Sequence, residues 1–211
     1  MSGQRLFRLG VLGSGKGSNF ATIADACARG DLRAEVSTVL CDVADAGILR
    51  EAAARGIRGE YIKPGTFRTK LDEEAERVYI ERLRAAEVDL VVMAGFMRIL
   101  KGEFLRAFSG RVVNIHPSLL PAFPGLEAWK QALEYGVKVT GCTVHFVDQG
   151  VDSGPIIAQE PVAILPEDTA ESLHERIQQA ERRLYPKVVG ALAEGKVVVK
   201  GRGVRVEWGG R

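Results

Sequence analysis

The sequence is poor in net charge, in cysteine and in long apolar runs, and each shortage excludes a class of protein. Its 29 Lys and Arg residues nearly balance 27 Asp and Glu residues, which gives no broad basic surface for nucleic acid or a membrane. The three cysteines, Cys27, Cys41 and Cys142, are scattered without a Cys-x-x-Cys pair. They predict reduced thiols in a cytoplasmic protein, without disulfides. No apolar run approaches the roughly 18 residues that span a bilayer.

Asparagine is scarcer still, because only Asn19 and Asn114 occur in the whole chain. Asn114 lies in the run Val112-Val113-Asn114-Ile115-His116-Pro117, where an apolar strand breaks into a proline-rich loop. Residues i and i+2 of a strand point to the same side, so Asn114 and His116 project together. Open α/β sheets place their sites at the carboxyl ends of strands. This pair is therefore the first candidate for chemistry.

The first half of the chain alternates short apolar runs with amphipathic segments, which predicts a mostly parallel sheet with right-handed crossovers. The expected strands are residues 8–12, 36–41, 59–62, 88–93 and 112–115, and the expected helices are residues 18–29, 44–55, 70–85 and 102–108. The predicted fold is α/β, a Rossmann-like three-layer arrangement.

The second half changes pattern and predicts antiparallel additions to this sheet. Longer strands are expected at 139–147 and 155–164, followed by a helix from Thr169 to about Ala193 that Asp168 and Glu171 open as a capping box. A hairpin at 197–208 turns on glycines. No linker divides the chain, so we expect one domain, 1–211, with a phosphate-binding half (about 1–108) and a catalytic half (about 109–211).

A glycine-rich turn, Gly13-Ser14-Gly15-Lys16-Gly17-Ser18-Asn19, joins the first strand to the first helix. Glycines allow close approach to a ligand, and a helix start attracts anions; Ser18 and Asn19 add donors and are expected to cap the helix. Gly17 stands where a Walker motif needs Ser or Thr, and the glycine spacing is one residue short of the dinucleotide fingerprint, although Asp42 resembles a ribose-binding acid. The alternative is a turn that only joins the strand to the helix and binds no ligand. A single phosphate is the favoured guest.

Asp152, in a glycine-flanked loop between two strands, is the third candidate for catalysis beside Asn114 and His116. The alternatives without catalysis are that His116 is a hydrogen-bonded structural histidine and that Asp152 only forms a turn. His145 is expected to be a packed strand residue, and His174 lies among charged residues of the last helix. No His, Cys and carboxylate spacing is typical of zinc, so no metal is expected.

Four segments together resemble the phosphoribosylglycinamide formyltransferases, a branch of the folate-dependent formyltransferase family. They are Gly15-Lys16-Gly17-Ser18-Asn19, Ala94-Gly95-Phe96-Met97-Arg98-Ile99-Leu100, Asn114-Ile115-His116-Pro117-Ser118-Leu119-Leu120-Pro121 and Val151-Asp152-Ser153-Gly154-Pro155. The resemblance covers nearly the whole chain. Methionyl-tRNA formyltransferases and formyltetrahydrofolate hydrolases share the Asn–His–Asp set, but they carry added domains and differ in the glycine-rich turn.

The resemblance implies the role of each site residue. The catalytic residues are Asn114, His116 and Asp152, and the ribonucleotide phosphate is held by Gly17, Ser18 and Asn19, with Gln178 and Glu181 at the glycinamide. The folate is held by Lys70, Met97, Arg98, Ile99, Leu100, Asn114, Asp148, Gln149, Gly150, Val151 and Asp152.

The resemblance also implies an enzyme that passes the formyl group of 10-formyltetrahydrofolate, its co-substrate, to glycinamide ribonucleotide in purine biosynthesis. Asn114 and a protonated His116 would stabilise an oxyanion, and a carboxylate such as Asp152 favours the charged imidazole. The alternatives are formyl transfer to another amine, hydrolysis of the same folate, or a non-catalytic dinucleotide-binding module. The expected partners are these small molecules, without nucleic acid or membrane, and the chain is expected to be a monomer or homodimer.

Overall fold

The computed structural model describes residues 5–208, and the chain divides into two compact units, residues 1–113 and 114–211. The single domain predicted above stays a prediction. Within the described residues, no helix combines the length and the apolar character that crossing a bilayer requires.

The first unit is built from alternating strands and helices. Its strands are β1 (Phe7–Leu12), β2 (Ala34–Cys41), β3 (Gly59–Tyr61) and β4 (Leu90–Met93), and its helices are α1 (Ser18–Arg29), α2 (Gly47–Ala54), α3 (Glu73–Ala85) and α4 (Gly102–Ala107). β1 pairs in parallel with both β2 and β4, and β2 pairs in parallel with β3. Leu12 lies opposite Leu40 and Met93. The loops that follow these three strands therefore leave the sheet at one edge.

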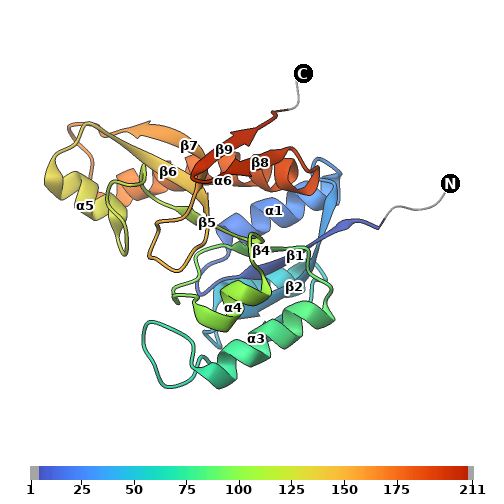
Figure 1. Cartoon of the computed structure of the whole chain (residues 1–211). Helices are drawn as coiled ribbons and strands as arrows, with labels where there is room; N and C mark the ends of the chain where they lie inside the picture. The colour runs from blue at the N-terminus through green and yellow to red at the C-terminus, as the bar shows by residue number, and fades with distance from the viewer. Residues whose placement is uncertain (1–4, 209–211) are drawn as a thin grey trace. The chain divides into compact units, whose positions relative to one another are not determined.

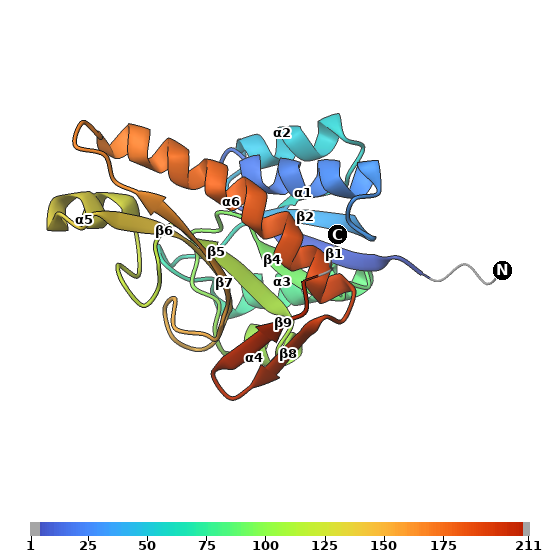
Figure 2. The ribbon, with the colours of Figure 1, turned by 90° about the horizontal axis from the view of Figure 1, so that it is seen from above.

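Helices cover both faces of the strands in the first unit. In Figure 1, α1 lies above these strands and α3 below them, and Figure 2 shows α2 beside α1. Apolar residues of α1 and α3, such as Phe20 and Leu83, are fully buried. This burial supplies most of the driving force that holds amphipathic helices on a sheet.

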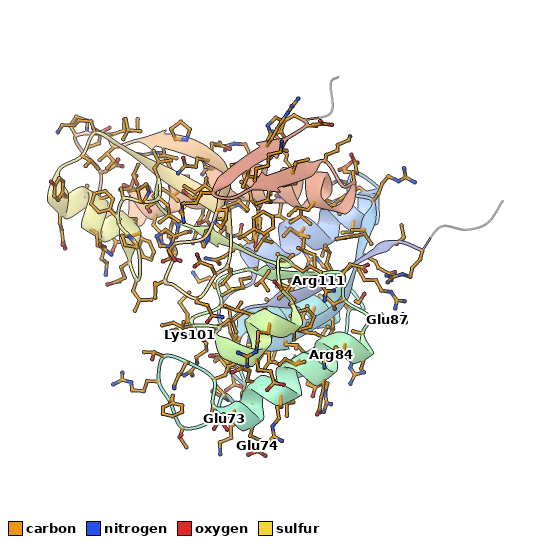
Figure 3. All side chains as sticks on the ribbon, viewed as in Figure 1. Glu73, Glu74, Arg84, Glu87, Lys101 and Arg111 are labelled. Atoms are coloured by element: carbon orange, nitrogen blue, oxygen red, sulfur yellow. The ribbon has the colours of Figure 1, made fainter. Side chains whose placement is uncertain are left out.

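Helix α3 shows why one predicted boundary shifted. The sequence predicted a start at Lys70, but the Asp72 side chain accepts a hydrogen bond from Ala75 N and makes residue 73 the first helical one. Glu73 and Glu74 lie at the N-terminal end and Arg84 in the last turn (Figure 3). This charge order matches the helix dipole.

The second unit holds the antiparallel part of the fold. Its elements are β5 (Val112–His116), which crosses the boundary between the units, α5 (Ala128–Tyr135), β6 (Val139–Phe146), β7 (Ile156–Ala163), α6 (Ala170–Ala193), β8 (Val197–Lys200) and β9 (Gly203–Val206). β6 and β7 pair antiparallel, and α6 packs against both (Figure 2). β8 and β9 form the predicted hairpin.

The seven-stranded sheet has the order β3-β2-β1-β4-β5-β6-β7, and β8 and β9 form a separate two-stranded sheet. The predicted α/β class, a mostly parallel sheet with antiparallel additions in the second half of the chain, is therefore confirmed.

One prediction about the helices of the second unit was wrong, and one helix was missed. Thr169, not Asp168, caps α6: its hydroxyl accepts from Ser172 N while Ser172 Oγ accepts from Thr169 N, a reciprocal capping box. Asp168 instead binds Arg176, with its two oxygens 2.6 Å from the guanidinium nitrogens. Helix α5 was not predicted at all. It is short, and it starts from Glu127 in a left-handed conformation without a side-chain cap.

Candidate active site

Strand β5 ends in the pair of side chains that the sequence singled out. Asn114 and His116 lie two residues apart on β5, as the alternation of a strand requires. The Asn114 amide nitrogen lies 3.3 Å from His145 Nε2, and His116 is 4% exposed. Both candidates are thus held against neighbouring residues of the second unit.

Both ring nitrogens of His116 face oxygen atoms. Nε2 lies 2.9 Å from the carbonyl oxygen of Phe123, and Nδ1 lies 3.4 Å from Asp152 Oδ2. A neutral imidazole has only one N–H, whereas the charged ring has two and can donate to both oxygens. A charged ring would therefore find one oxygen beside each of its N–H groups, and one of these oxygens belongs to the carboxylate that the sequence predicted.

Asp152 is held in an uncommon backbone conformation. Its φ is +49°, in the left-handed region that costs a non-glycine residue energy and is concentrated at functional sites. Its Oδ2 accepts a hydrogen bond of 2.8 Å from Gly125 N. At Gly154 a Cβ would lie 1.8 Å from the carbonyl oxygen of Phe146. The glycine therefore lets the loop turn tightly enough to present Asp152 to His116.

His145 joins this group, a role that the sequence analysis missed. It is buried on β6, as expected, with Nδ1 2.8 Å from the carbonyl oxygen of Phe146 and Nε2 3.7 Å from Asp152 Oδ1. Burial lowers the pKa of His145. A neutral ring that donates from Nδ1 accepts at Nε2, so His145 accepts from Asn114 and orients its amide. One sequence signal could have indicated this role. His145 lies two residues after Thr143 on the same strand, so the two side chains point to the same side, and Thr143 binds the loop after β5.

The glycine-rich turn of the first unit is shaped by Gly17. Its φ is +84°, and a Cβ there would lie 2.8 Å from Ile48 Cα, so both conformation and space require glycine. A Cβ on Gly15 would meet nothing within 4 Å. The N-cap of α1 is Gly17, which corrects the expectation that Ser18 and Asn19 cap the helix. Their side chains lie in its first turn instead, beside backbone N–H groups that have no i−4 acceptor within the helix.

Asp42, the candidate for a ribose-binding acid, is occupied by the protein itself. Ser14 Oγ donates to one of its oxygens at 2.5 Å, and Arg98 Nε donates to the other at 2.7 Å. Its side chain is 2% exposed. A carboxylate satisfied in this way does not present itself to a ribose, which counts against the dinucleotide alternative.

The folate-binding residues predicted in the first unit lie close together. Lys70 and Ile99 form an isolated parallel bridge, and Ile99 N donates to Thr69 O. The Lys70 ammonium lies 4.2 Å from the ring centre of Phe67. Met97 is exposed and Leu100 is buried, whereas the Arg98 side chain is bound to protein oxygens.

The predicted folate residues 148–152 lie in a loop of the second unit that is held by internal hydrogen bonds. Asp148 Oδ1 accepts from Gly150 N and from Ser153 Oγ, at 3.1 and 2.7 Å. Arg202 of β9's hairpin donates to Ser153 O at 2.9 Å. Val151 is half exposed. The loop therefore has a defined shape around the strained Asp152.

Comparison with known proteins identifies the family. The formyl transferase family model matches residues 7–189. The chain belongs to the formyl transferase family. It is 50% identical to the phosphoribosylglycinamide formyltransferase of Mycobacterium tuberculosis over 200 residues, 92% of this chain and 89% of that protein. It is also 45% identical over 202 residues to the trifunctional purine biosynthetic protein adenosine-3 of Drosophila melanogaster, covering 94% of this chain but only 15% of that protein.

A solved structure agrees with both relatives. The crystal structure of glycinamide ribonucleotide transformylase 1 from Symbiobacterium toebii has a TM-score of 0.91 and 47% identity, covering 98% of this chain and 99% of that chain. The resemblance drawn from the four sequence segments is therefore confirmed, and the chain is a formyltransferase, a one-carbon group transferase.

Helix α6 of this formyltransferase carries the two residues expected at the glycinamide. Glu181 is a carboxylate buried to 6% exposure, and its charge helps to raise the pKa of Cys142, after the larger effect of burial, to about 12. Gln178 Nε2 lies 3.2 Å from His174 Nε2, and the His174 ring stacks on Trp129 with centroids 3.6 Å apart.

The structure thus brings together Asn114, His116 and Asp152 in the second unit of the formyltransferase, with His145 added. In the first unit it brings Lys70 beside the 97–100 segment. Among the described residues, no three His, Cys, Asp or Glu side chains are grouped so that they could hold a metal ion.

Proposed function

We propose that this formyltransferase moves the formyl group of 10-formyltetrahydrofolate to the amine of glycinamide ribonucleotide, a step of de novo purine biosynthesis. The observation that carries the proposal is the group at the end of β5, where His116 lies 3.4 Å from Asp152 and Asn114 is oriented by His145. The names of the similar Mycobacterium tuberculosis and Symbiobacterium toebii proteins, a phosphoribosylglycinamide formyltransferase and a glycinamide ribonucleotide transformylase, support the same substrate.

The two substrates are assigned to the residues expected from the sequence. Gly17, Ser18 and Asn19 bind the 5′-phosphate at the start of α1, where N–H groups and the helix dipole favour an anion. Gln178 and Glu181 face the glycinamide. The folate lies against Lys70, the 97–100 segment, Asn114 and the 148–152 loop.

In the proposed reaction the substrate amine attacks the formyl carbon and forms a C–N bond. The formyl oxygen becomes the oxyanion of a tetrahedral intermediate. A proton passes from the attacking nitrogen to N10 of the folate, and cleavage of the bond between carbon and N10 releases tetrahydrofolate and the formylated ribonucleotide. Asp152 accepts and returns this proton, directly or through water.

The oxyanion is stabilised by Asn114 and His116. One N–H of the Asn114 amide points at His145, and the second is the donor for the oxyanion. Each N–H of charged His116 has a protein acceptor, the Phe123 carbonyl or Asp152. One of these contacts therefore gives way to the substrate oxygen. Loss of one such donor typically costs about 100- to 1000-fold in rate.

Incubation of the protein with 10-formyltetrahydrofolate, with and without glycinamide ribonucleotide, tests the proposal. We expect tetrahydrofolate and the formylated ribonucleotide to appear in equal amounts, and only when the ribonucleotide is present. Formate release without ribonucleotide would instead identify a hydrolase, and transfer to a different amine would identify another transferase. The cytoplasmic location and the monomeric or dimeric state stay predictions.

A further inference from the structure

Asp42 lies where three parallel strands of the first unit end together. It follows β2 directly, while Ser14 follows β1 and the segment after β4 begins at Ala94. Asp42 is buried, and each of its carboxylate oxygens accepts one short hydrogen bond, from Ser14 Oγ and from Arg98 Nε. The proposed mechanism does not use this carboxylate.

The Ser14 hydroxyl connects Asp42 to two segments at once. Ser14 belongs to the glycine-rich turn, and its Oγ also accepts from Met97 N at 2.9 Å. Ser14 N donates to the carbonyl oxygen of Gly95 at 3.0 Å. The turn that precedes Gly17 and the backbone that leads into the 97–100 segment are therefore held by one serine, whose hydroxyl hydrogen Asp42 fixes.

Arg98 extends the same network to the loop before α3. Its Nη1 donates to the carbonyl oxygens of Phe67 and Arg68, at 2.6 and 2.7 Å, while its Nε binds Asp42. This loop contains Lys70. The Arg98 side chain is 16% exposed, so without Asp42 its charge would be left largely inside the protein without a counterion.

We infer that Asp42 is a positioning residue that holds the phosphate-binding turn and the folate-binding 97–100 segment in register with each other. The inference rests on the proposed function, because that function assigns one substrate to each segment. A single carboxylate that touches neither substrate then determines how well both are bound.

Asp42→Asn tests the inference with nearly unchanged shape. The amide keeps one acceptor but places an NH2 group against Ser14 or Arg98, so one of the two hydrogen bonds is lost. We expect KM to rise about 10-fold for the ribonucleotide and for the folate alike, the scale of losing a hydrogen bond to a charged group. We expect kcat to stay within about 3-fold of the wild type, because the affected contacts are made equally in ground and transition states.

Ser14→Ala is the second variant, should Asp42→Asn fail to fold. It removes the hydroxyl that accepts from Met97 and should raise both KM values as well. In the double variant the combined loss should be smaller than the product of the two single losses, since Asp42 and Ser14 are hydrogen-bonded to each other and belong to one network.

Two control variants separate positioning from general destabilisation. Tyr79→Phe removes a buried hydroxyl for which the described residues offer no hydrogen-bond partner, on the helix that follows the Arg98-bound loop. Asp168→Asn breaks an ion pair with Arg176 in the second unit, in which the carboxylate is as little exposed as that of Asp42. Asp168→Asn should lower Tm at least as much as Asp42→Asn, and both controls should leave the two KM values unchanged.

A readout without turnover keeps the inference testable by itself. Hydrogen exchange of the Met97 and Ile99 amides should accelerate in Asp42→Asn relative to wild type, and not in Tyr79→Phe. Unchanged exchange would overturn the inference, as would a rise in only one KM or in neither. If the wild-type protein transfers no formyl group, the proposed function fails, while the exchange result still decides whether Asp42 holds the two segments.

Discussion

Two aspartates, the buried Asp42 of the first unit and the partly exposed Asp152 of the second, are held in opposite ways. Asp42 accepts short hydrogen bonds of 2.5 and 2.7 Å from side chains at both oxygens. Asp152 accepts one backbone hydrogen bond at 2.8 Å, and its contacts with His116 and His145 are longer, at 3.4 and 3.7 Å. Asp152 also sits in a left-handed backbone conformation, with φ +49°.

The difference separates positioning from chemistry. A carboxylate whose two oxygens both accept short hydrogen bonds from side chains is most stable in that one arrangement. Such a carboxylate therefore fixes the positions of its partners. A carboxylate with long contacts to two imidazoles can exchange partners as charge moves during a reaction. We therefore expect substitutions of Asp42 to act on KM and substitutions of Asp152 to act on kcat.

The largest effect is expected for Asp152→Asn. Asparagine keeps the shape but cannot accept a proton or favour a charged His116, so kcat should fall by about 100- to 10,000-fold, the range of general acid–base catalysis. Both KM values should change little. Steady-state kinetics with each substrate varied in turn measures both quantities.

Asp148→Asn is the matched control for Asp152→Asn, because it changes a carboxylate of the same loop that binds Gly150 and Ser153. It should weaken folate binding without a comparable loss of kcat. Near-normal turnover in Asp152→Asn would remove the distinction between the two aspartates.

A smaller loss of kcat is expected for His145→Leu. Leucine cannot accept from the Asn114 amide, whose donor toward the oxyanion would then lose its orientation; losing one partner of a buried hydrogen bond costs about 1–3 kcal/mol. Turnover should therefore fall about 10-fold or more. His145→Gln should restore part of it, because its Oε1 can accept from Asn114. Equal turnover in the two variants would show that His145 acts only as packing.

Ser18→Ala should affect binding alone, in contrast to the changes around Asp152. If Ser18 donates to the phosphate, its loss should raise KM for the ribonucleotide about 10-fold with kcat unchanged, because the phosphate is held equally before and during the reaction. Thr22→Val is the control, since the Thr22 hydroxyl binds Ser18 O within the same helix. A KM equal to that of wild type in Ser18→Ala would argue against a phosphate at this turn.

The sequence predicted most of the fold because, along the first half, the hydrophobic periodicity and the glycines at the ends of elements indicate the same boundaries. α1 was predicted at its observed bounds, since glycines stand on both sides of it. Helix α5 was missed because its start depends on a left-handed Glu127 rather than on a capping side chain. The cap of α6 was misplaced by one residue because Asp168 has a stronger partner in Arg176, eight residues along the chain.

The sequence predicted those parts of the site whose residues are close together in the chain. Asn114 and His116 followed from the two-residue period of one strand. The contacts of His145 with Asn114 and Asp152 join residues that are 31 and 7 positions apart, so only the pairing of strands reveals them. The same holds for Asp42, whose partners Ser14 and Arg98 come from the ends of two other strands.

The smallest expected effect is on the free energy of unfolding at acidic pH, and it tests whether His145 is held neutral in the folded protein. Burial lowers the pKa of His145, so the unfolded chain, with an ordinary histidine pKa of about 6.5, takes up a proton that the folded protein does not. The stability contributed by neutral His145 is therefore fully present above about pH 6.5 and is lost as the pH falls below it.

In His145→Gln this proton uptake disappears, so the free energy of unfolding should decline less steeply below about pH 6.5, by at most about 1.4 kcal/mol per pH unit. The neighbouring groups Asp152, His116 and Asp148 are the same in both proteins, so the comparison isolates the contribution of His145. Urea unfolding of wild type and variant across this range measures the difference. Parallel pH profiles would mean that folding does not lower the pKa of His145, so burial would not hold the ring in the neutral form that accepts from Asn114 in the proposed oxyanion site.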